Sequence, residues 1–152
     1  MALPERKLAG HHKSMSLADN QTFELWRGFM PDRSKVTGSL PTELFSVRVY
    51  PPDAKWYDPN QLFEKWAAVE VTDFKSIGEG FDTMALPGGL YAVFHYKGLN
   101  TDTRIFEYIF RDWLPASEYV LEERPHFEIL GPKYRNNDPE SEEEIYLPIR
   151  LR

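Results

Sequence analysis

The chain has 152 residues, no cysteine and a formal net charge of −6. This length fits one domain with a sizeable core. The acidic balance disfavours a protein that follows nucleic-acid phosphates, because such binding depends on lysine and arginine, so no direct nucleic-acid binding is expected. The lack of cysteine excludes disulfides, thiol catalysis and cysteine metal sites, and it suits a reducing compartment.

The chain also lacks the apolar segments that direct proteins to membranes. Its start, residues 1–7, has no apolar core of signal-peptide length, and no apolar run approaches the roughly 20 residues of a membrane span. These features predict a soluble, cytoplasmic protein. Aromatic residues make up 14% of the chain. Two interpretations of this excess remain open: an aromatic-rich core, or a cavity that some of the rings line.

The first half of the chain predicts a strand, a helix and two further strands. Residues 7–17 read as a strand, and Asp19-Asn20 offers a cap for a helix that Pro31 interrupts. Strict alternation predicts a half-buried strand at 44–50, and another strand follows at 66–71. Spacings of three and four place five apolar residues on one helical face: Phe23, Leu25, Trp26, Phe29 and Met30.

The second half predicts the same order of elements. The segment 72–89 is rich in glycine and proline and is expected to be a connection. The predicted elements are a strand at 90–96, a helix capped by Asn100 or Thr101 and ended by Pro115, a strand around Glu128 and a strand at 145–151. The apolar stripe of this second helix comprises Ile105, Phe106, Ile109, Phe110 and Trp113.

The two halves match when the chain is shifted by 80 residues against itself. Pro52 then meets Pro132, and the turn Asp58-Pro59 meets Asp138-Pro139. Predicted elements, turn residues and helix faces coincide without a gap. The sequence therefore predicts an α+β fold built from a duplicated βαββ unit. A single domain, 1–152, is expected, with repeats at about 7–71 and 90–152 joined by the connection 72–89.

A single carboxylate, Glu128, interrupts an apolar strand that a proline bounds on each side. Side chains alternate along a strand, so Phe127 and Ile129 share one face and Glu128 points to the other. Tyr146 points away from the apolar face of the last strand in the same way. If the apolar faces pack under the helices, then Glu128, Tyr146 and Trp66 are expected to converge on one cleft.

The helix aromatics Trp26, Phe106 and Phe110 are expected to line the edges of this cleft. An aromatic pocket with one carboxylate suits a flat cation, since each ring adds roughly 0.5–2 kcal/mol of cation–π attraction. Burial would raise the pKa of Glu128, which also fits a general acid or base. The alternative interpretations are that Glu128 faces water and that the aromatic residues only fill the core.

Other features point to no metal site and no organic cofactor. His11 and His12 are neighbours in a strand and face opposite sides, which disfavours a shared metal ion. The glycines at 78–80 and 88–89 are not followed by the Gly-Lys-Ser/Thr of a phosphate loop. The acidic run 140–144 is expected to be a solvated turn and edge.

Three segments carry a family pattern: 90–98 before the second helix, 125–129, and the ending 143–149. With them the chain resembles the GyrI-like domain, also described as the AraC-type or bacterial transcription-activator effector-binding domain. The resemblance implies a pseudo-twofold arrangement, a curved antiparallel sheet, two main helices and a central cleft. It also implies that Glu128 is the family's cleft glutamate and Tyr146 the tyrosine of its C-terminal strand. Some family members are multidrug-sensing domains that hold lipophilic cations.

Two departures from the family pattern are present. Many members have a proline and a tyrosine after the glycine that ends the fourth strand, whereas Leu99-Asn100 follow Gly98 here. Family regulators also carry a helix-turn-helix domain, for which this chain has no room. The preferred hypothesis is a stand-alone module for a small hydrophobic or cationic ligand. The alternatives are a hydrolase of cyclopropane-containing or other electrophilic toxins, in which Glu128 and Tyr146 act, and a protein-interaction module like gyrase-inhibitory relatives.

Overall fold

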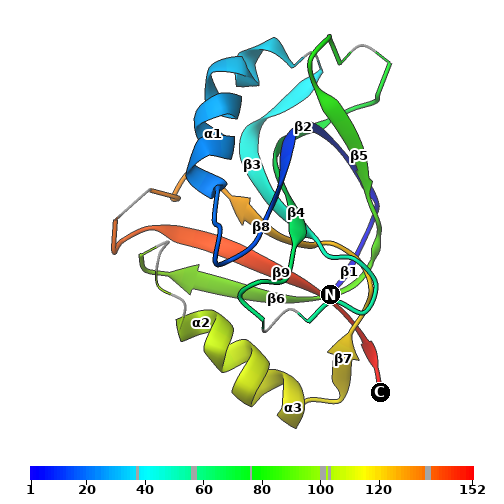
Figure 1. The fold of residues 1–152 in the computed structure, drawn as a ribbon. Helices are drawn as coiled ribbons and strands as arrows, with labels where there is room; N and C mark the ends of the chain where they lie inside the picture. Colours follow the sequence, from blue (N-terminus) through cyan, green and yellow to red (C-terminus); the bar gives the residue numbers. More distant parts are fainter. Residues whose placement is uncertain (37, 56–57, 76, 100–101, 103, 136–137) are drawn as a thin grey trace.

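A computed structural model describes residues 1–36, 38–55, 58–75, 77–99, 102, 104–135 and 138–152, without the side chains of 39–42. Its antiparallel strands form one curved sheet, and two helical segments lie against that sheet (Figure 1). The predicted α+β fold with a curved antiparallel sheet and two main helices is therefore confirmed.

The elements of the first half are β1 (Ala2–Leu3), β2 (Arg6–Met15), α1 (Thr22–Phe29), the 3-10 helix η1 (Met30–Lys35), β3 (Ser39–Val49), β4 (Phe63–Val71) and β5 (Asp82–Leu86). Those of the second half are β6 (Gly89–Lys97), α2 (Arg104–Glu107), the π-helix η2 (Tyr108–Trp113), α3 (Leu114–Ala116), β7 (Tyr119–Leu121), β8 (His126–Leu130) and β9 (Glu142–Leu151). Every predicted strand is present. The short strands β1, β5 and β7 are additional, and β5 lies inside the segment predicted to be a connection.

The helix boundaries follow the local chemistry only in part. The Asn20 side chain accepts a hydrogen bond from the Thr22 amide at 3.0 Å, and α1 gives way to η1 just before Pro31, as expected. The predicted caps Asn100 and Thr101 lie outside the described residues. The second helical segment ends at Ala116, one residue after Pro115, as predicted.

The strands are ordered β1-β6-β9-β8-β3-β4-β2-β5, with β7 beside β9. The two repeats meet where β3 pairs with β8, and Val47 there lies opposite Phe127, 80 residues later. Val47 also pairs with Trp66, just as Phe127 pairs with Tyr146. The pseudo-twofold axis therefore passes beside the Val47–Phe127 pair.

The first strand of each repeat departs from this spacing. His12 in β2 pairs with Trp66, but it is Val93, 81 residues later, that pairs with Tyr146. The gapless alignment is therefore wrong for β2 and β6, which are related by one residue more than the other strands.

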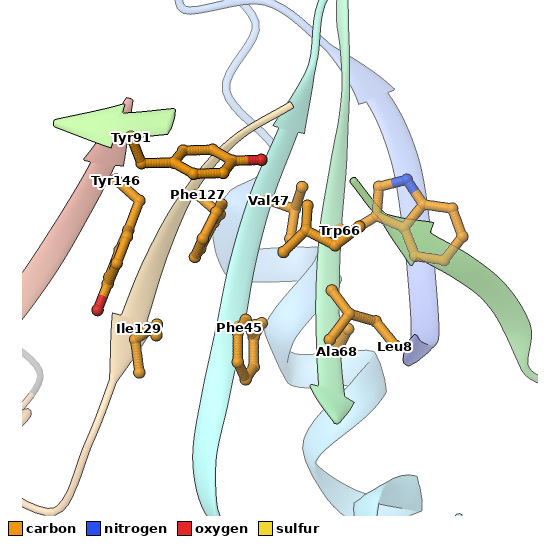
Figure 2. Close-up of a cluster of buried hydrophobic side chains, with 10 residues drawn as sticks. Leu8, Phe45, Val47, Trp66, Ala68, Tyr91, Phe127, Ile129 and Tyr146 are labelled. Atoms are coloured by element: carbon orange, nitrogen blue, oxygen red, sulfur yellow. The ribbon is translucent and has the colours of Figure 1, made fainter. Parts of the chain in front are cut away.

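The two faces of the sheet bury different parts of the core. The face that the helices cover, here called the helix face, packs against Leu25 and Phe29 of α1 and Ile109 of η2. The other face is lined by a separate group of side chains, drawn in Figure 2, with α1 behind the strands. This opposite-face cluster comprises Leu8, Phe45, Val47, Trp66, Ala68, Leu86, Tyr91, Phe127, Ile129 and Tyr146.

The apolar face predicted for the first helix is narrower than expected. Leu25 and Phe29, four residues apart, are buried against the sheet, and Trp26 packs beside them. Phe23 is 66% exposed and Met30 43% exposed, so both were placed wrongly. Phe23 lies two positions before Leu25, which turns it to the far side of the helix. The stripe of the second helical segment is confirmed, since all five of its residues pack in one cluster.

Gly10 in β2 marks a place where two strands leave no room for a side chain. A Cβ atom there would collide with the carbonyl oxygen of Ala67 and lie 2.7 Å from the Cα of Ala68. Gly10→Ala is therefore expected to lower the free energy of unfolding by ~1–3 kcal/mol, as overpacking does. Gly28→Ala in α1 is the control, because nothing lies within 4 Å of a Cβ at that position. Urea unfolding measures both, and an unchanged Gly10→Ala would contradict the close approach.

Candidate functional site

Glu128 lies on the helix face of the sheet, near the pseudo-twofold axis. It pairs across β8 and β9 with Ile145, which packs under η2, so both side chains share that face. The side chain is partly exposed. The predicted strand and its alternation are thereby confirmed: Phe127 and Ile129 point one way and Glu128 the other.

Three other charged side chains act on Glu128 from neighbouring strands. They are Arg48 of β3, Lys65 of β4 and Glu143 of β9. Lys65 is only 5% exposed and Glu143 only 8%, which is rare for charged residues. These four residues are here called the central charge cluster. Its cations come from the first repeat and its carboxylates from the second.

The two carboxyl groups of this cluster share one proton. Burial, together with the hydrogen bond to Glu128 and the charge of Glu128, raises the pKa of Glu143 to about 9. In its ionised form, Glu143 would leave its buried Oε2 without a donor among the described residues, and protonation lets it donate to Glu128. Burial would also raise the pKa of Glu128, but the hydrogen bond from Glu143 and the cations Lys65 and Arg48 lower it.

The prediction that burial raises the pKa of Glu128 is therefore wrong. Its neighbours outweigh burial, so Glu128 is the ionised member of the pair and Glu143 the protonated one. Two carboxyl groups in contact cannot both ionise cheaply, and the more buried one keeps the proton.

The basic members of the site are perturbed as well. Burial and the charge of Arg48 lower the pKa of Lys65 to about 7, although the charge of Glu128 acts against this. Burial and Arg48 also lower the pKa of His126 to about 4. His126 shares the helix face because it pairs with Arg48. At neutral pH, Arg48 is thus the one permanent cation of the central charge cluster.

Aromatic rings from both repeats surround Arg48. Its guanidinium carbon lies 5.7 Å from the ring centre of Phe63 in β4 and 5.6 Å from that of Phe106 in α2. Its buried Nε has no hydrogen-bond partner among the described residues. Phe106 therefore reaches the central charge cluster. Phe110 packs in the cluster around Ile109, and Trp26 packs beside Phe29 on the α1 side.

Trp66 and Tyr146 do not join Glu128, and the predicted convergence is wrong. Tyr146 pairs with Phe127, and its ring stacks on that of Phe127 at 4.6 Å with a 6° tilt. Trp66 pairs with Val47, so both aromatic residues belong to the opposite-face cluster (Figure 2). The sheet itself separates them from Glu128. The reason is the pairing register: Phe127 lies directly opposite Tyr146, so both side chains point to the same face of the sheet, and Glu128 points to the other.

Lys65 and Glu143 belong to the central charge cluster, although nothing in the sequence prediction singled them out. The acidic run 140–144 was expected to be solvated, but Glu143 is buried within it. The signal was present: Glu143 continues the alternation of Ile145 and Leu147, and Lys65 continues that of Phe63 and Ala67. Side chains two residues apart in a strand share one face, so a charged residue that continues an apolar alternation points into the core with the apolar residues.

The described side chains offer no metal site. No group of three or more histidine and acidic side chains in that part of the chain is placed to hold an ion. His11 and His12 do face opposite sides: His11 stacks on Phe81, and His12 stacks on Trp66 at 4.5 Å.

A hollow of about 490 Å³ lies at the end of β6 and the start of α2. None of the predicted site residues lines it. Its walls are Tyr96, Lys97, Gly98, Leu99, Asp102, Arg104, Ile105 and Pro139. This is the edge where Leu99 departs from the family pattern, and the hydroxyl of Tyr96 there donates to the Leu99 carbonyl at 2.7 Å.

This fold is shared with a known protein family and with several solved structures. The family model of the GyrI-like small molecule binding domain matches residues 2–150. SAV2435 bound to tetraphenylphosphonium superposes with a TM-score of 0.66 at 14% identity, covering 99% of this chain and 92% of that one. The EcmrR C-terminal domain gives 0.68 at 14% identity, with 100% and 96% covered. A hydrolase encoded by lin2189 from Listeria innocua gives 0.61 at 9% identity, with 99% and 90% covered.

These identities are low, so the structural neighbours show a shared fold and no more. No curated protein sequence matches the chain significantly. Within the described residues, no helix has the length and apolar character to cross a bilayer. The family match rests on almost the whole length of the chain. The chain therefore belongs to the GyrI-like small-molecule-binding domains.

Proposed function

We propose that this domain binds lipophilic aromatic compounds with a positive charge on the helix face of its sheet, with Glu128 as their counter-ion. The observation that carries the proposal is the position of Glu128: an ionised, partly exposed carboxylate beside the pseudo-twofold axis, on the face that both helical segments cover. A structural neighbour, SAV2435, is bound to tetraphenylphosphonium, which is a lipophilic cation.

The aromatic walls of the proposed site come from the helices. Phe106 already holds one cation, the guanidinium of Arg48, at 5.6 Å. Trp26 and Phe110 complete the walls in the proposal. Each well-placed ring adds roughly 0.5–2 kcal/mol to the binding of a cation. Trp66 and Tyr146 have no part, because they lie on the opposite face.

Isothermal titration with tetraphenylphosphonium and with neutral triphenylphosphine oxide tests this proposal. Glu128→Gln is expected to weaken binding of the cation about tenfold or more, roughly 1.4 kcal/mol, and to leave binding of the neutral compound unchanged. Glu144→Gln is the control, since Glu144 is exposed and belongs to the other face of β9. Equal losses for the two compounds in Glu128→Gln would rule out a counter-ion role.

A second candidate function is hydrolysis of a strained or electrophilic ligand. The observation that favours it is the carboxyl pair, in which Glu128 is ionised and Glu143 is protonated. Such a pair supplies a base for water and an acid for the leaving atom. Mass spectrometry of an epoxide or cyclopropane electrophile incubated with the protein tests this function. It requires a hydrolysed product that Glu128→Gln and Glu143→Gln both suppress, and no product from the wild type would remove it.

A further inference from the structure

Resting on the proposed function, we propose that Lys65 is a specificity-determining residue of this site: a built-in cation that competes with a cationic ligand for Glu128. Lys65 lies on the helix face of β4, beside Ala67, and is 5% exposed. Lys65 pairs with Arg48 of β3, two residues along that strand from Ser46, which pairs with Glu128 of β8. Glu128 attracts Lys65 across the sheet, and Arg48 repels it.

The charges around Lys65 decide whether Glu128 is available to a cationic ligand. The facing groups on the packed strands are Arg48 on β3, Glu128 and His126 on β8, Glu143 on β9, and Lys13 on β2, which pairs with Lys65. With Glu143 protonated and His126 neutral, Glu128 is the single negative charge of the cluster. Arg48 and Lys65 together therefore exceed it, and a ligand cation meets a site that is already neutralised.

Lys65 is the cation of the cluster that can lose its charge. An arginine does not lose its proton in a protein, so Arg48 stays charged. Burial places the pKa of Lys65 near 7, where losing its proton costs little. Arrival of a second cation at Glu128 then favours neutral Lys65, and one proton leaves to the buffer.

The pseudo-symmetry shows that the fold itself does not need this charge. Arg48 pairs with Lys65 in the first repeat, and Glu128 pairs with Ile145 at the same place in the second. An apolar residue thus occupies the equivalent position without loss of the architecture. Lys65→Met is therefore expected to fold, with its side chain in the same apolar surroundings.

The test measures the affinity for tetraphenylphosphonium at about pH 6 and pH 8. If only neutral Lys65 admits the cation, the wild type is expected to bind about tenfold tighter at the higher pH, because the competent fraction rises from roughly a tenth to almost all. Lys65→Met is expected to lose this dependence and to bind about tenfold tighter than wild type at about pH 6. Lys13→Met, at the exposed partner position, is the matched control and keeps the wild-type dependence.

A second readout needs no variant. Titration calorimetry of the wild type at about pH 6.5 in phosphate and in Bis-Tris reports the protons released on binding. Most of one proton per bound cation is expected, and none for triphenylphosphine oxide.

Three results would overturn the proposal. They are an unchanged pH dependence in Lys65→Met, a wild type that binds the cation equally at both pH values, and binding without proton release. The proposed function fails separately, when Glu128→Gln binds the cation as the wild type does. A cation that binds neither the wild type nor Lys65→Met at about pH 8 overturns both.

Discussion

Replacing Glu143 by glutamine is expected to stabilise the protein increasingly as the pH rises from about 5 to 9. The pKa of Glu143 is raised to about 9 by burial and by Glu128, whereas the unfolded chain releases this proton near its ordinary value of about 4.3. Between these values the folded state holds a proton that the unfolded state lacks. The stability that Glu143 contributes is therefore complete below about pH 4.3 and is lost as the pH approaches about 9, by up to ~1.4 kcal/mol per pH unit.

Glutamine removes this titration and keeps a donor for Glu128. The difference in unfolding free energy between Glu143→Gln and the wild type is thus expected to grow to several kcal/mol at the alkaline end. Urea unfolding at about pH 5, 7 and 9 measures it, and comparison with the wild type cancels the titrations of Lys65 and His126. Glu144→Gln, one residue further along β9 and exposed, is expected to show a constant small difference. A constant difference for Glu143→Gln would mean that Glu143 is ionised in the folded protein.

Replacing Phe29 by alanine is expected to cost about 3–5 kcal/mol of unfolding free energy. Phe29, the last residue of α1, is fully buried between the helix and the sheet. The centre of its ring lies 5.5 Å from that of His11 and 6.0 Å from that of Trp26. The loss combines the transfer of a buried ring to water with the cavity that remains. The Phe29 ring anchors α1 on the sheet, and α1 carries Trp26, one of the proposed walls of the ligand site.

Phe23→Ala in the same helix is the matched control. Phe23 is 66% exposed, so its replacement is expected to change stability by no more than about 0.5 kcal/mol. Urea unfolding of both variants at one pH gives the comparison. Equal losses would contradict the orientation of α1, and a small loss for Phe29→Ala would contradict its burial.

Local sequence patterns predicted the helices and strands of this fold, but not which faces of neighbouring strands lie on the same side of the sheet. The alternation of Glu128 and of Tyr146 within their own strands was correctly predicted. Which face of β9 matches which face of β8 depends on the pairing of Phe127 with Tyr146, and that register is set by long-range contacts. A shift of one residue in this pairing would have brought Tyr146 to Glu128.

The charged members of the site show the same limit. Glu128 stood out because apolar residues flank it on both sides. Lys65 and Glu143 lie at the polar ends of apolar periods, where the sequence alone does not tell whether the charge reaches water. Their burial arises because β3, β4, β8 and β9 meet at the pseudo-twofold axis, where Arg48 and Lys65 face the charge of Glu128 and Glu143 hydrogen-bonds to Glu128.

The most direct test of a ligand site on the helix face follows the tryptophan indole signals in a ¹⁵N–¹H spectrum during titration with tetraphenylphosphonium. Trp26 lies on the helix face and Trp66 on the opposite face, so the sheet separates the two probes. Single Trp→Phe variants assign the signals. The expected result is a saturable shift of the Trp26 signal while the Trp66 signal stays in place. A shift of Trp66 with Trp26 unmoved would put the ligand among Tyr146 and Phe127 instead, and would contradict the role assigned to Glu128.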